Sequence, residues 1–452
     1  MDSPVDTLQQ FVAQRPQVQR WLVAYSGGLD STVLLHCLAR LKLTQPLLAI
    51  HVHHNLSPRA DSWQAHCRAT CAALGITFHT ANVQLTDTGK GLEDAARTAR
   101  YRVFKQLLQA GDGLLLAHHR DDQAETLLLR LLRGSGPKGL AAMPEQRPLG
   151  RGNLYRPWLG LERAQLLQLA QQWGIDWVED ESNLSQDFDR NYLRHQVMPA
   201  LQQRWPGFSQ RWQQSARLCG QYDALAEQVA AQDLQLAEPR PERCGASLDL
   251  PAVKALDPFR RGNLLRHWVA SLGLEMPEQV HLQEIETQLI NAAEPDVAEV
   301  RWGRLALRCY RQRLYAIPQW REPAPAPRAW SGAEPVHWGC WQLSLQPVNA
   351  GGFSIPAAGF TLARRQPGER CQPSWRNHSQ TLKKLLQEVG LEPWLRDQVP
   401  ILRASGSDAI VAVGDLWVCR DALVEQGPGY RLQWCYRPRD ATADHSGPYP
   451  GE

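Results

Sequence analysis

The sequence has no long hydrophobic run. Across its 452 residues, there is no stretch of about 18 apolar residues, the length that crosses a lipid bilayer. The N-terminal Met1-Asp2-Ser3-Pro4 also lacks the basic and apolar parts of a secretory signal. These absences predict a cytoplasmic protein that does not bind a membrane.

Paired cysteines are missing too. None of the ten cysteines forms a Cys-x-x-Cys motif, which argues against a zinc ribbon or an iron–sulfur cluster. Scattered cysteines in a long chain are typical of reduced thiols in a cytoplasm. A large excess of charge is also absent, because the net charge is only +3. Total charge therefore does not indicate nucleic-acid binding, and only local clusters of Arg and Lys can do so.

The chain is long enough for several domains. Apolar runs alternate with helical patterns up to about residue 173, which predicts parallel βαβ units in a doubly wound α/β sheet of the Rossmann-like kind. A mostly helical middle domain and a small α+β C-terminal domain should follow. We expect these parts at 1–215, 216–320 and 335–436, with a disordered polar tail at 437–452.

The most informative stretch is Ser26-Gly27-Gly28-Leu29-Asp30-Ser31. It lies between a predicted strand at 21–25 and a predicted helix at 32–41, so its backbone N–H groups can bind a phosphate at a helix N-terminus. Asp30 can hold a hard cation such as Mg²⁺. Two glycines alone would equally make an ordinary turn, but six motif residues between a strand and a helix favour a phosphate site.

Two further polar clusters follow predicted strands. They are His51-Val52-His53-His54 and His118-His119-Arg120-Asp121. Ligands of doubly wound sheets bind at the carboxyl ends of the strands. The three clusters should therefore meet at one edge of the sheet.

Asp122 and Glu125 are three residues apart on a predicted helix and share one face. Such a pair of carboxylates can bind an ammonium group or a metal ion. The alternative is a helix N-terminus with acidic residues in its first turn, which is common. Zinc is not favoured, because the spacing fixes no third ligand.

Basic residues follow this helix and recur later. Arg133 and Lys138 flank a glycine-rich stretch that either presents cations to phosphate or simply ends the helix in a solvated turn. Arg190 and Arg194 share a helix face that can reach phosphate.

In this order, the motifs resemble those of the tRNA(Ile)-lysidine synthetases, a family of PP-loop ATP pyrophosphatases, in their long, three-domain form. The resemblance covers most of the chain. It rests on Ser26–Ser31, His51–Leu56, Arg97–Tyr101, His118–Thr126, Arg133–Leu140, Asp180–Asn183 with Arg190–Arg194, Arg364–Arg370, Lys383–Glu388, Pro393–Arg396 and Val413–Val418.

The resemblance implies a reaction. A family member adenylates the wobble cytidine of tRNA(Ile) with a CAU anticodon, and free lysine then displaces AMP to form lysidine. ATP would be the substrate, Mg²⁺ the cofactor, and the enzyme a monomer or a homodimer.

The resemblance also implies site residues. ATP would bind at Ser26, Gly27, Gly28, Leu29, Asp30, Ser31 and His51, with Mg²⁺ at Asp30. Lysine would bind at Asp122 and Glu125, and the catalytic set would be Asp30, Arg97, His118, Asp122 and Glu125. The tRNA would contact Arg133, Lys138, Arg190, Arg194, Arg364, Arg365, Arg370, Lys383 and Lys384.

Three other functions have to be weighed. A tRNA thiolase with the same loop usually needs a catalytic cysteine pair or a cluster, and the sequence has neither motif. An amidotransferase with an N-terminal nucleophilic cysteine is excluded by Asp2. A non-catalytic RNA-binding protein is disfavoured by the intact set of Asp30, Ser31, Asp122 and Glu125.

Overall fold

The structure, a computed structural model, describes residues 3–55, 57–84, 91–179, 181, 188–293, 296, 298–319, 325–407 and 409–437. They form two compact units that divide between Leu225 and Ala226, inside helix α10 (Phe208–Leu236). The predicted tail lies outside the described residues, except for Arg437.

The first unit is built on a six-stranded sheet with the strand order β3-β2-β1-β4-β6-β5. Five strands are parallel, and β5 runs antiparallel to β6. The strands are β1 (Arg20–Ala24), β2 (Leu47–His53), β3 (Thr77–Asn82), β4 (Asp112–Leu115), β5 (Gln146–Leu149) and β6 (Gly152–Tyr155). The chain moves outward from β1 to β3 and then returns to β4, which confirms the doubly wound α/β prediction.

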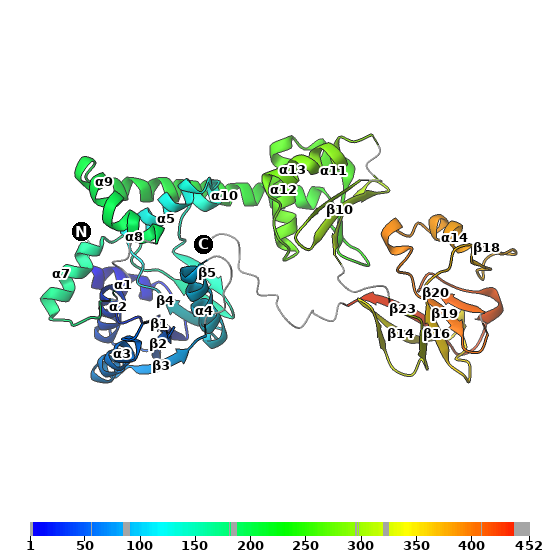
Figure 1. Ribbon diagram of the computed structural model, residues 1–452, viewed down its shortest axis with the longest axis horizontal. Coiled ribbons are helices and arrows are strands. Elements are labelled where there is room, and N and C mark those ends of the chain that lie inside the picture. Colours follow the sequence, from blue (N-terminus) through cyan, green and yellow to red (C-terminus); the bar gives the residue numbers. More distant parts are fainter. Residues whose placement is uncertain are drawn as a thin grey trace. The chain divides into compact units, whose positions relative to one another are not determined.

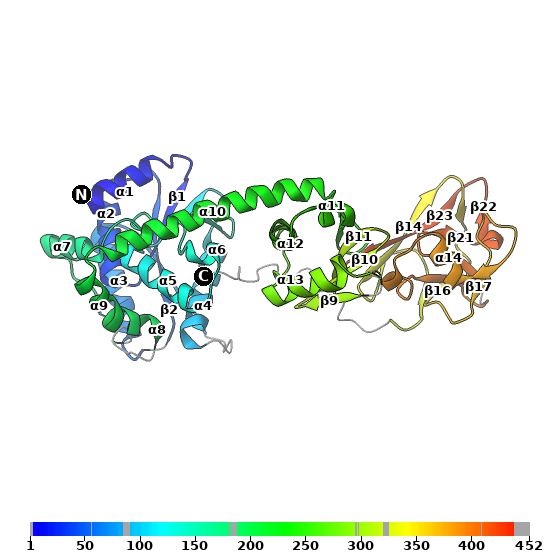
Figure 2. The same ribbon diagram turned by 90° about the horizontal axis from the view of Figure 1, so that it is seen from above.

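Helices cover both faces of this sheet (Figures 1 and 2). They are α1 (Pro4–Ala13), α2 (Leu29–Arg40), α3 (Ala60–Leu74), α4 (Leu92–Leu107), α5 (Arg120–Leu132), α6 (Pro137–Leu140) and α7 (Arg163–Trp173). Trp21 and Val23 share a core with α1, α2 and α7, whereas Leu22 packs with α4 on the other face. β1 therefore reads as an unbroken apolar run, as a strand buried on both faces should.

The last part of the first unit is helical. It comprises α8 (Asp189–Tyr192), the π-helical turn η2 (Leu193–Val197), α9 (Met198–Arg204) and the first part of α10. Pro199 has no N–H to donate to the preceding turn, which explains a wider turn directly before it. The helices of this part are interrupted at Pro206 and at Gly207, whose φ is 73°.

The second unit begins with helices packed on an antiparallel sheet of the order β7-β8-β11-β10-β9. The helices are α11 (Leu250–Ala255), α12 (Pro258–Ser271), α13 (Gln279–Ile285) and the π-helical η3 (Glu286–Ile290). The strands are β7 (Arg240–Pro241), β8 (Ala246–Asp249), β9 (Glu299–Trp302), β10 (Leu305–Tyr310) and β11 (Arg313–Pro318). These helices lie between β8 and β9 along the chain, in the part predicted to be mostly helical.

The C-terminal part of the second unit has two five-stranded sheets and one short strand pair. The strands are β12 (Arg328–Trp330), β13 (Val336–Trp338), β14 (Trp341–Val348), β15 (Gly352–Phe353), β16 (Phe360–Ala363), β17 (Arg370–Cys371), β18 (Gln380–Thr381), β19 (Ile401–Ala404), β20 (Ile410–Val413), β21 (Trp417–Val418), β22 (Leu423–Val424) and β23 (Gly429–Tyr436). The helices are α14 (Leu382–Glu388) and the 3₁₀ turns η5 (Pro393–Leu395) and η6 (Arg420–Ala422). Trp338, Trp341 and Trp434 lie in its core.

Within the described part of the chain, no helix has both the length and the apolar character that crossing a membrane requires.

Candidate active site

The Ser26–Ser31 turn joins β1 to α2. Gly28 caps the helix with an extended backbone conformation, and Leu29 and Asp30 form its first turn. The N-terminal N–H groups of a 12-residue helix therefore begin at this turn. This is the local geometry that binds a phosphate group.

Hydrogen bonds from hydroxyl groups stabilise the backbone of the turn. The Ser26 and Ser31 hydroxyls lie 3.0 Å apart, and the Ser31 hydroxyl donates to the Gly28 carbonyl at 3.1 Å. The buried Thr32 hydroxyl hydrogen-bonds to the carbonyls of Gly27 and Gly28, at 3.1 and 2.8 Å. The backbone is thus held in shape before any ligand arrives.

Gly27 meets two requirements that only glycine satisfies. Its φ is +87°, and a Cβ atom there would lie 2.8 Å from the Sγ of buried Cys67 on α3. Its carbonyl also accepts from the N–H of Val178 at 2.9 Å. The turn is therefore enclosed by α3 and by the chain that follows α7.

The histidines after β2 lie beside this turn. The Nδ1 of His51 is 3.0 Å from the carbonyl oxygen of Tyr25, directly before the turn. Burial lowers the pKa of His51. Burial also lowers the pKa of His54 to about 4, with a further contribution from Arg100. The structure therefore joins two of the three predicted strand-end clusters.

His119 links the third cluster to the first. It is buried directly before α5, and its Nε2 lies 3.6 Å from Oδ2 of Asp30 and 3.3 Å from Oδ2 of Asp122. Its Nδ1 lies 3.4 Å from Oδ2 of Asp121. Although burial alone would lower the pKa of His119, these three carboxylates raise it to about 10. The three carboxylates around His119 thus favour its charged form.

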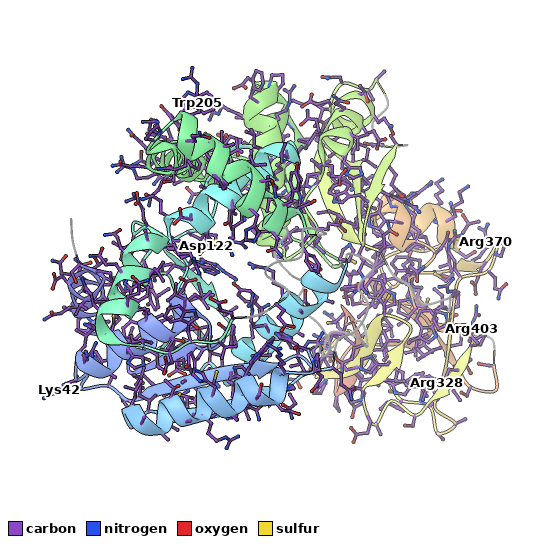
Figure 3. The ribbon with its side chains drawn as sticks, turned by 60° about the vertical axis from the view of Figure 1, so that its left-hand side comes forward. Lys42, Asp122, Trp205, Arg328, Arg370 and Arg403 are labelled. Carbon is purple, nitrogen blue, oxygen red and sulfur yellow. The ribbon has the colours of Figure 1, made fainter. Side chains whose placement is uncertain are left out.

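The two carboxylates of the predicted acid pair face two guanidinium groups (Asp122 is labelled in Figure 3). The Nε of Arg190 donates to Glu125 at 2.8 Å, and the Nε of Arg194 donates to the other oxygen of Glu125 at 2.7 Å. Each arginine also lies 3.1 Å from Oδ1 of Asp122. Burial would raise the pKa of Asp122, but His119 and the two arginines hold it well below its usual range.

These contacts engage two residues that the sequence assigned to tRNA. Arg190 and Arg194 lie on α8 and η2, and in this state both pair with the predicted lysine site. The charges of the two buried carboxylates are balanced by those of the two half-buried guanidinium groups. Each guanidinium occupies the position that an incoming ammonium group would need.

The carboxylate of Asp30 is suited to a divalent cation. Its Oδ1 is buried without a hydrogen-bond partner, and the nearest cation is the Nε of Arg163 at 3.6 Å. The described residues contain no group of three or more acidic, His or Cys side chains that suits a metal ion. Mg²⁺ typically binds one or two carboxylates together with substrate phosphates, so one free carboxylate oxygen fits it.

His118 and Arg97 have partners of their own. The Nδ1 of His118 accepts a hydrogen bond at 3.1 Å from the Nε of Arg156, which directly follows β6. Arg97 lies with its guanidinium 5.0 Å from the centre of the Tyr101 ring, on the same helix. His118 is thus bonded to a residue at the end of the neighbouring strand β6, and Arg97 packs against an aromatic ring of α4.

Sequence reasoning missed Arg156 and Arg163. Arg156 lies beyond a four-residue strand, Gly-Asn-Leu-Tyr, that is too short and too polar to be recognised. Arg163 opens α7, and its backbone N–H also donates to Asp121 at 2.8 Å. A basic residue at the start of a helix gives no sign in the sequence that it meets a carboxylate.

The predicted tRNA-binding residues fall in both units. In the first, Arg133 is exposed at the end of α5 and lies 4.0 Å from Asp189, and Lys138 lies in α6. The predicted loop at Asp180–Asn183 is outside the described residues except for Glu181, which pairs with Arg59 at 2.7 Å.

In the second unit, Arg370 pairs in register with Thr381, so it lies beside the exposed Lys383 and Lys384 at the start of α14. Arg364 and Arg365 have local partners, since they hydrogen-bond to Gln398 and to the carbonyl of Arg396. Figure 3 marks Arg370 and Arg403 in this part of the chain.

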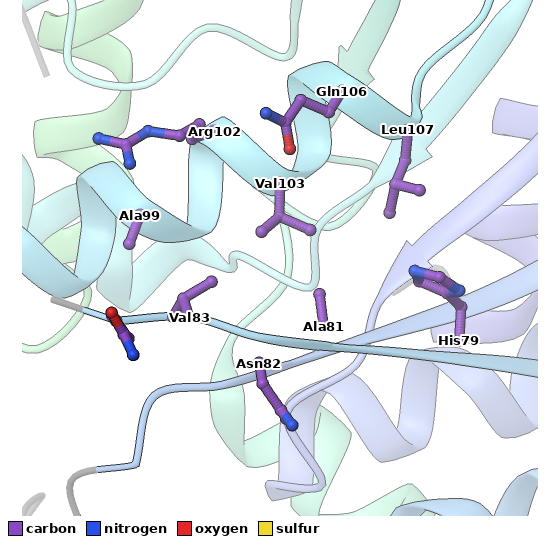
Figure 4. A pocket seen from close by; sticks show the side chains of 10 residues that line it. His79, Ala81, Asn82, Val83, Ala99, Arg102, Val103, Gln106 and Leu107 are labelled. Atoms are coloured by element: carbon purple, nitrogen blue, oxygen red, sulfur yellow. The ribbon is translucent and has the colours of Figure 1, made fainter.

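A pocket of about 540 Å³ lies away from these groups, between β3 and α4 (Figure 4). His79, Arg102 and Gln106 contribute to its lining, and no predicted site residue does. The phosphate-binding turn and the acid pair are therefore separate from it.

Comparisons with known proteins match three regions of the chain. Residues 2–201 match the PP-loop domain, 248–315 the TilS substrate binding domain and 360–434 the TilS substrate C-terminal domain. A tRNA(Ile)-lysidine synthase from Alkalilimnicola ehrlichii is 42% identical over 435 residues, which cover 94% of this chain and 96% of the relative. The chain belongs to the tRNA(Ile)-lysidine synthase family. The Coxiella burnetii synthase is 36% identical, with 92% of each chain covered. The match spans both units, so the resemblance drawn from the sequence motifs is confirmed, and within this family the PP-loop domain uses ATP.

Proposed function

We propose that this chain uses ATP to join free lysine to C2 of the wobble cytidine, position 34, of tRNA(Ile) with a CAU anticodon. AMP and pyrophosphate would be released. One observation carries the proposal: a turn at Ser26–Ser31 with the geometry of a phosphate site and a buried acid pair at Asp122 and Glu125 are linked through His119. The family membership of the whole chain supports the same reaction.

The turn serves the first step. In that step the base oxygen at C2 attacks the α-phosphate of ATP, the bond between the α- and β-phosphates breaks, and pyrophosphate leaves. The N–H groups at the start of α2 and the Ser26 and Ser31 hydroxyls are suited to bind the departing charge. Asp30 would hold Mg²⁺, which when bound supplies positive charge to the phosphate oxygens.

The acid pair serves the second step. Lysine arrives as a cation, and Asp122 and Glu125 provide two buried negative charges for its ε-ammonium group. One carboxylate then accepts a proton, the neutral amine attacks C2 of the adenylated base, and AMP leaves. Lysine has to displace at least one of the guanidinium groups of Arg190 and Arg194, because these now occupy the same oxygens.

The exposed cations would bind the tRNA backbone. Arg133 in the first unit and Arg370, Lys383 and Lys384 in the second are exposed and can neutralise phosphates. Arg190 and Arg194 are half-exposed, so an RNA phosphate can compete with the acid pair for them. The wobble base of a single-stranded anticodon loop can be splayed out into the site.

The proposal is tested by incubating the protein with ATP, radiolabelled lysine and the tRNA transcript. Label should enter tRNA(Ile) with the CAU anticodon, with one AMP formed per lysine. The initiator or elongator tRNA(Met), which shares that anticodon, is the control and should remain unlabelled. Formation of AMP without label in the tRNA would contradict the lysine step.

A further inference from the structure

Arg156 is the most deeply buried charged side chain of the site, and the proposed reaction does not yet use it. Its side chain has no exposed surface. It follows β6 directly, and β6 runs parallel to β4 with Tyr155 opposite Leu115. Arg156 and His118 therefore project from the carboxyl ends of two neighbouring strands.

Backbone carbonyls fix both the main chain and the side chain of Arg156. The backbone N–H donates to the carbonyl of Glu145 at 2.8 Å, and the Nη1 of the guanidinium donates to the carbonyl of Pro144 at 2.7 Å. Its Nε is then directed at the Nδ1 of His118, 3.1 Å away. Because the guanidinium is fixed, the position of the imidazole ring is fixed with it.

The direction of this hydrogen bond determines the proton on His118. A guanidinium has donors only and does not lose its proton in proteins. The Nδ1 of His118 must therefore be the acceptor, and the proton of the neutral ring lies on Nε2. A second proton on Nδ1 would oppose the N–H of Arg156.

The surrounding charges favour the same state. Burial holds the pKa of His118 well below its usual range. Asp122 acts in the opposite direction, and the cations Arg156, Arg190 and Arg100 reinforce the effect of burial. Burial and these cations therefore favour the neutral ring that the hydrogen bond from Arg156 requires.

We propose that Arg156 is a positioning residue that fixes His118 as a neutral hydrogen-bond donor through Nε2. This inference rests on the proposed function and on the catalytic role that the family resemblance gives to His118. In this role His118 donates a hydrogen bond to a phosphate oxygen during adenylation and takes no proton from the reactants, since Nε2 already carries one. A neutral imidazole is an established electrophile in enzymes of other classes.

The experiment observes the ring directly. Protein labelled with ¹⁵N on histidine is followed by NMR, with the His118 signals identified from a His118→Gln variant. In the wild-type protein, His118 should show a protonated Nε2 and an unprotonated Nδ1 that do not change between about pH 5.5 and 8.5. A ring that titrates near pH 6.5, or one with its proton on Nδ1, overturns the proposal without any substitution at Arg156.

Variants then separate positioning from packing. In Arg156→Met, the His118 ring should populate both neutral tautomers and should titrate. The kcat for tRNA-dependent pyrophosphate release should fall about tenfold or more. KM for ATP should change little. Arg156→Lys keeps a cationic donor and should restore part of both properties.

The matched control is Arg130→Met. Arg130 is also a buried arginine of the first unit, and it donates to the carbonyls of Gly139 and Ala142 at 2.8 and 2.9 Å. This variant should lower the thermal midpoint without changing the His118 signals. If Arg156→Met folds and leaves the tautomer unchanged, Arg156 acts only in packing. The NMR result is independent of whether label enters tRNA, so the two proposals fail separately.

Discussion

Single side chains in this site are defined by partners that are distant along the chain. Spacing on a helix brings Asp122 and Glu125 to one face, and that part of the site was visible in the sequence. The partners were not, because Arg190 and Arg194 reach the same oxygens only through the path of the chain between them. Local pattern thus identifies the acids, while tertiary structure supplies their counter-ions.

Asp30 offers the sharpest test of the ATP step. Asp30→Asn removes the charge that would hold Mg²⁺ and should reduce tRNA-dependent ATP–pyrophosphate exchange by about a hundredfold or more. Asp61→Asn, on an exposed carboxylate that pairs with His53, is the control and should leave exchange intact. Full exchange in Asp30→Asn would refute the metal role.

Glu125 tests the amine step. Glu125→Gln keeps the shape of the side chain but removes one of the two charges that would bind the ε-ammonium group, so KM for lysine should rise between about tenfold and a hundredfold. Pyrophosphate release in the absence of lysine should persist. The matched change Glu162→Gln, at an exposed ion pair with Arg120, should alter neither quantity. An unchanged KM would remove Glu125 from the lysine site.

His54 gives stability a defined pH dependence. Its pKa in the folded protein is lowered to about 4, whereas the unfolded chain takes up that proton near pH 6.5. Between these values the unfolded state binds more protons, so the free energy of unfolding falls as pH falls from about 6.5 to 4. Calorimetry on His54→Gln should show a shallower decline than the wild type. An unchanged slope in His54→Gln would contradict this account.

At the scale of secondary-structure elements, strongly periodic segments were predictable and short ones were not. The strand predicted at 21–25 is β1 within one residue, because a parallel strand buried on both faces is a continuous apolar run. β5 and β6 were missed, since four-residue strands containing Pro148 or Gly152 have no such signal. Because β6 was missed, Arg156, which directly follows it, was missed as well.

α8 and η2 form the element whose position decides access to the acid pair. If Arg194 occupies the site that lysine needs, Arg194→Gln should strengthen the binding of lysine to the tRNA-free protein by about tenfold. Isothermal titration calorimetry measures this directly. Arg133→Gln, on an exposed arginine at the end of α5, is the control. Weaker lysine binding in Arg194→Gln would instead make the guanidinium part of the lysine site.

At the scale of the whole molecule, the order of the parts followed from the sequence. The shift from βαβ pattern to helices and then to short strands was visible along the chain. The division inside α10 was not, because a continuous helix has no Pro- or Gly-rich linker to mark where one unit ends.

The second unit has its own test. Replacing Lys383 and Lys384 together by Ala should weaken tRNA binding and lower the slope of log Kd against log salt by about 1 to 2, because two phosphate contacts are lost. Filter binding at several salt concentrations measures that slope. Lys42→Ala, on an exposed lysine of the first unit, should leave it unchanged. An unaltered slope in the double variant would exclude this surface from the interface.

The contact between Gly27 and Cys67 has an evolutionary consequence. Since a Cβ on residue 27 would lie only 2.8 Å from Cys67 Sγ, a side chain larger than cysteine at position 67 should press on the backbone of Gly27. Descendants of this gene that gain leucine or phenylalanine there should lose nucleotide use while every residue of the Ser26–Ser31 motif remains in place. The Ser26–Ser31 motif alone therefore does not show that a related sequence is active, and residue 67 has to be compared as well.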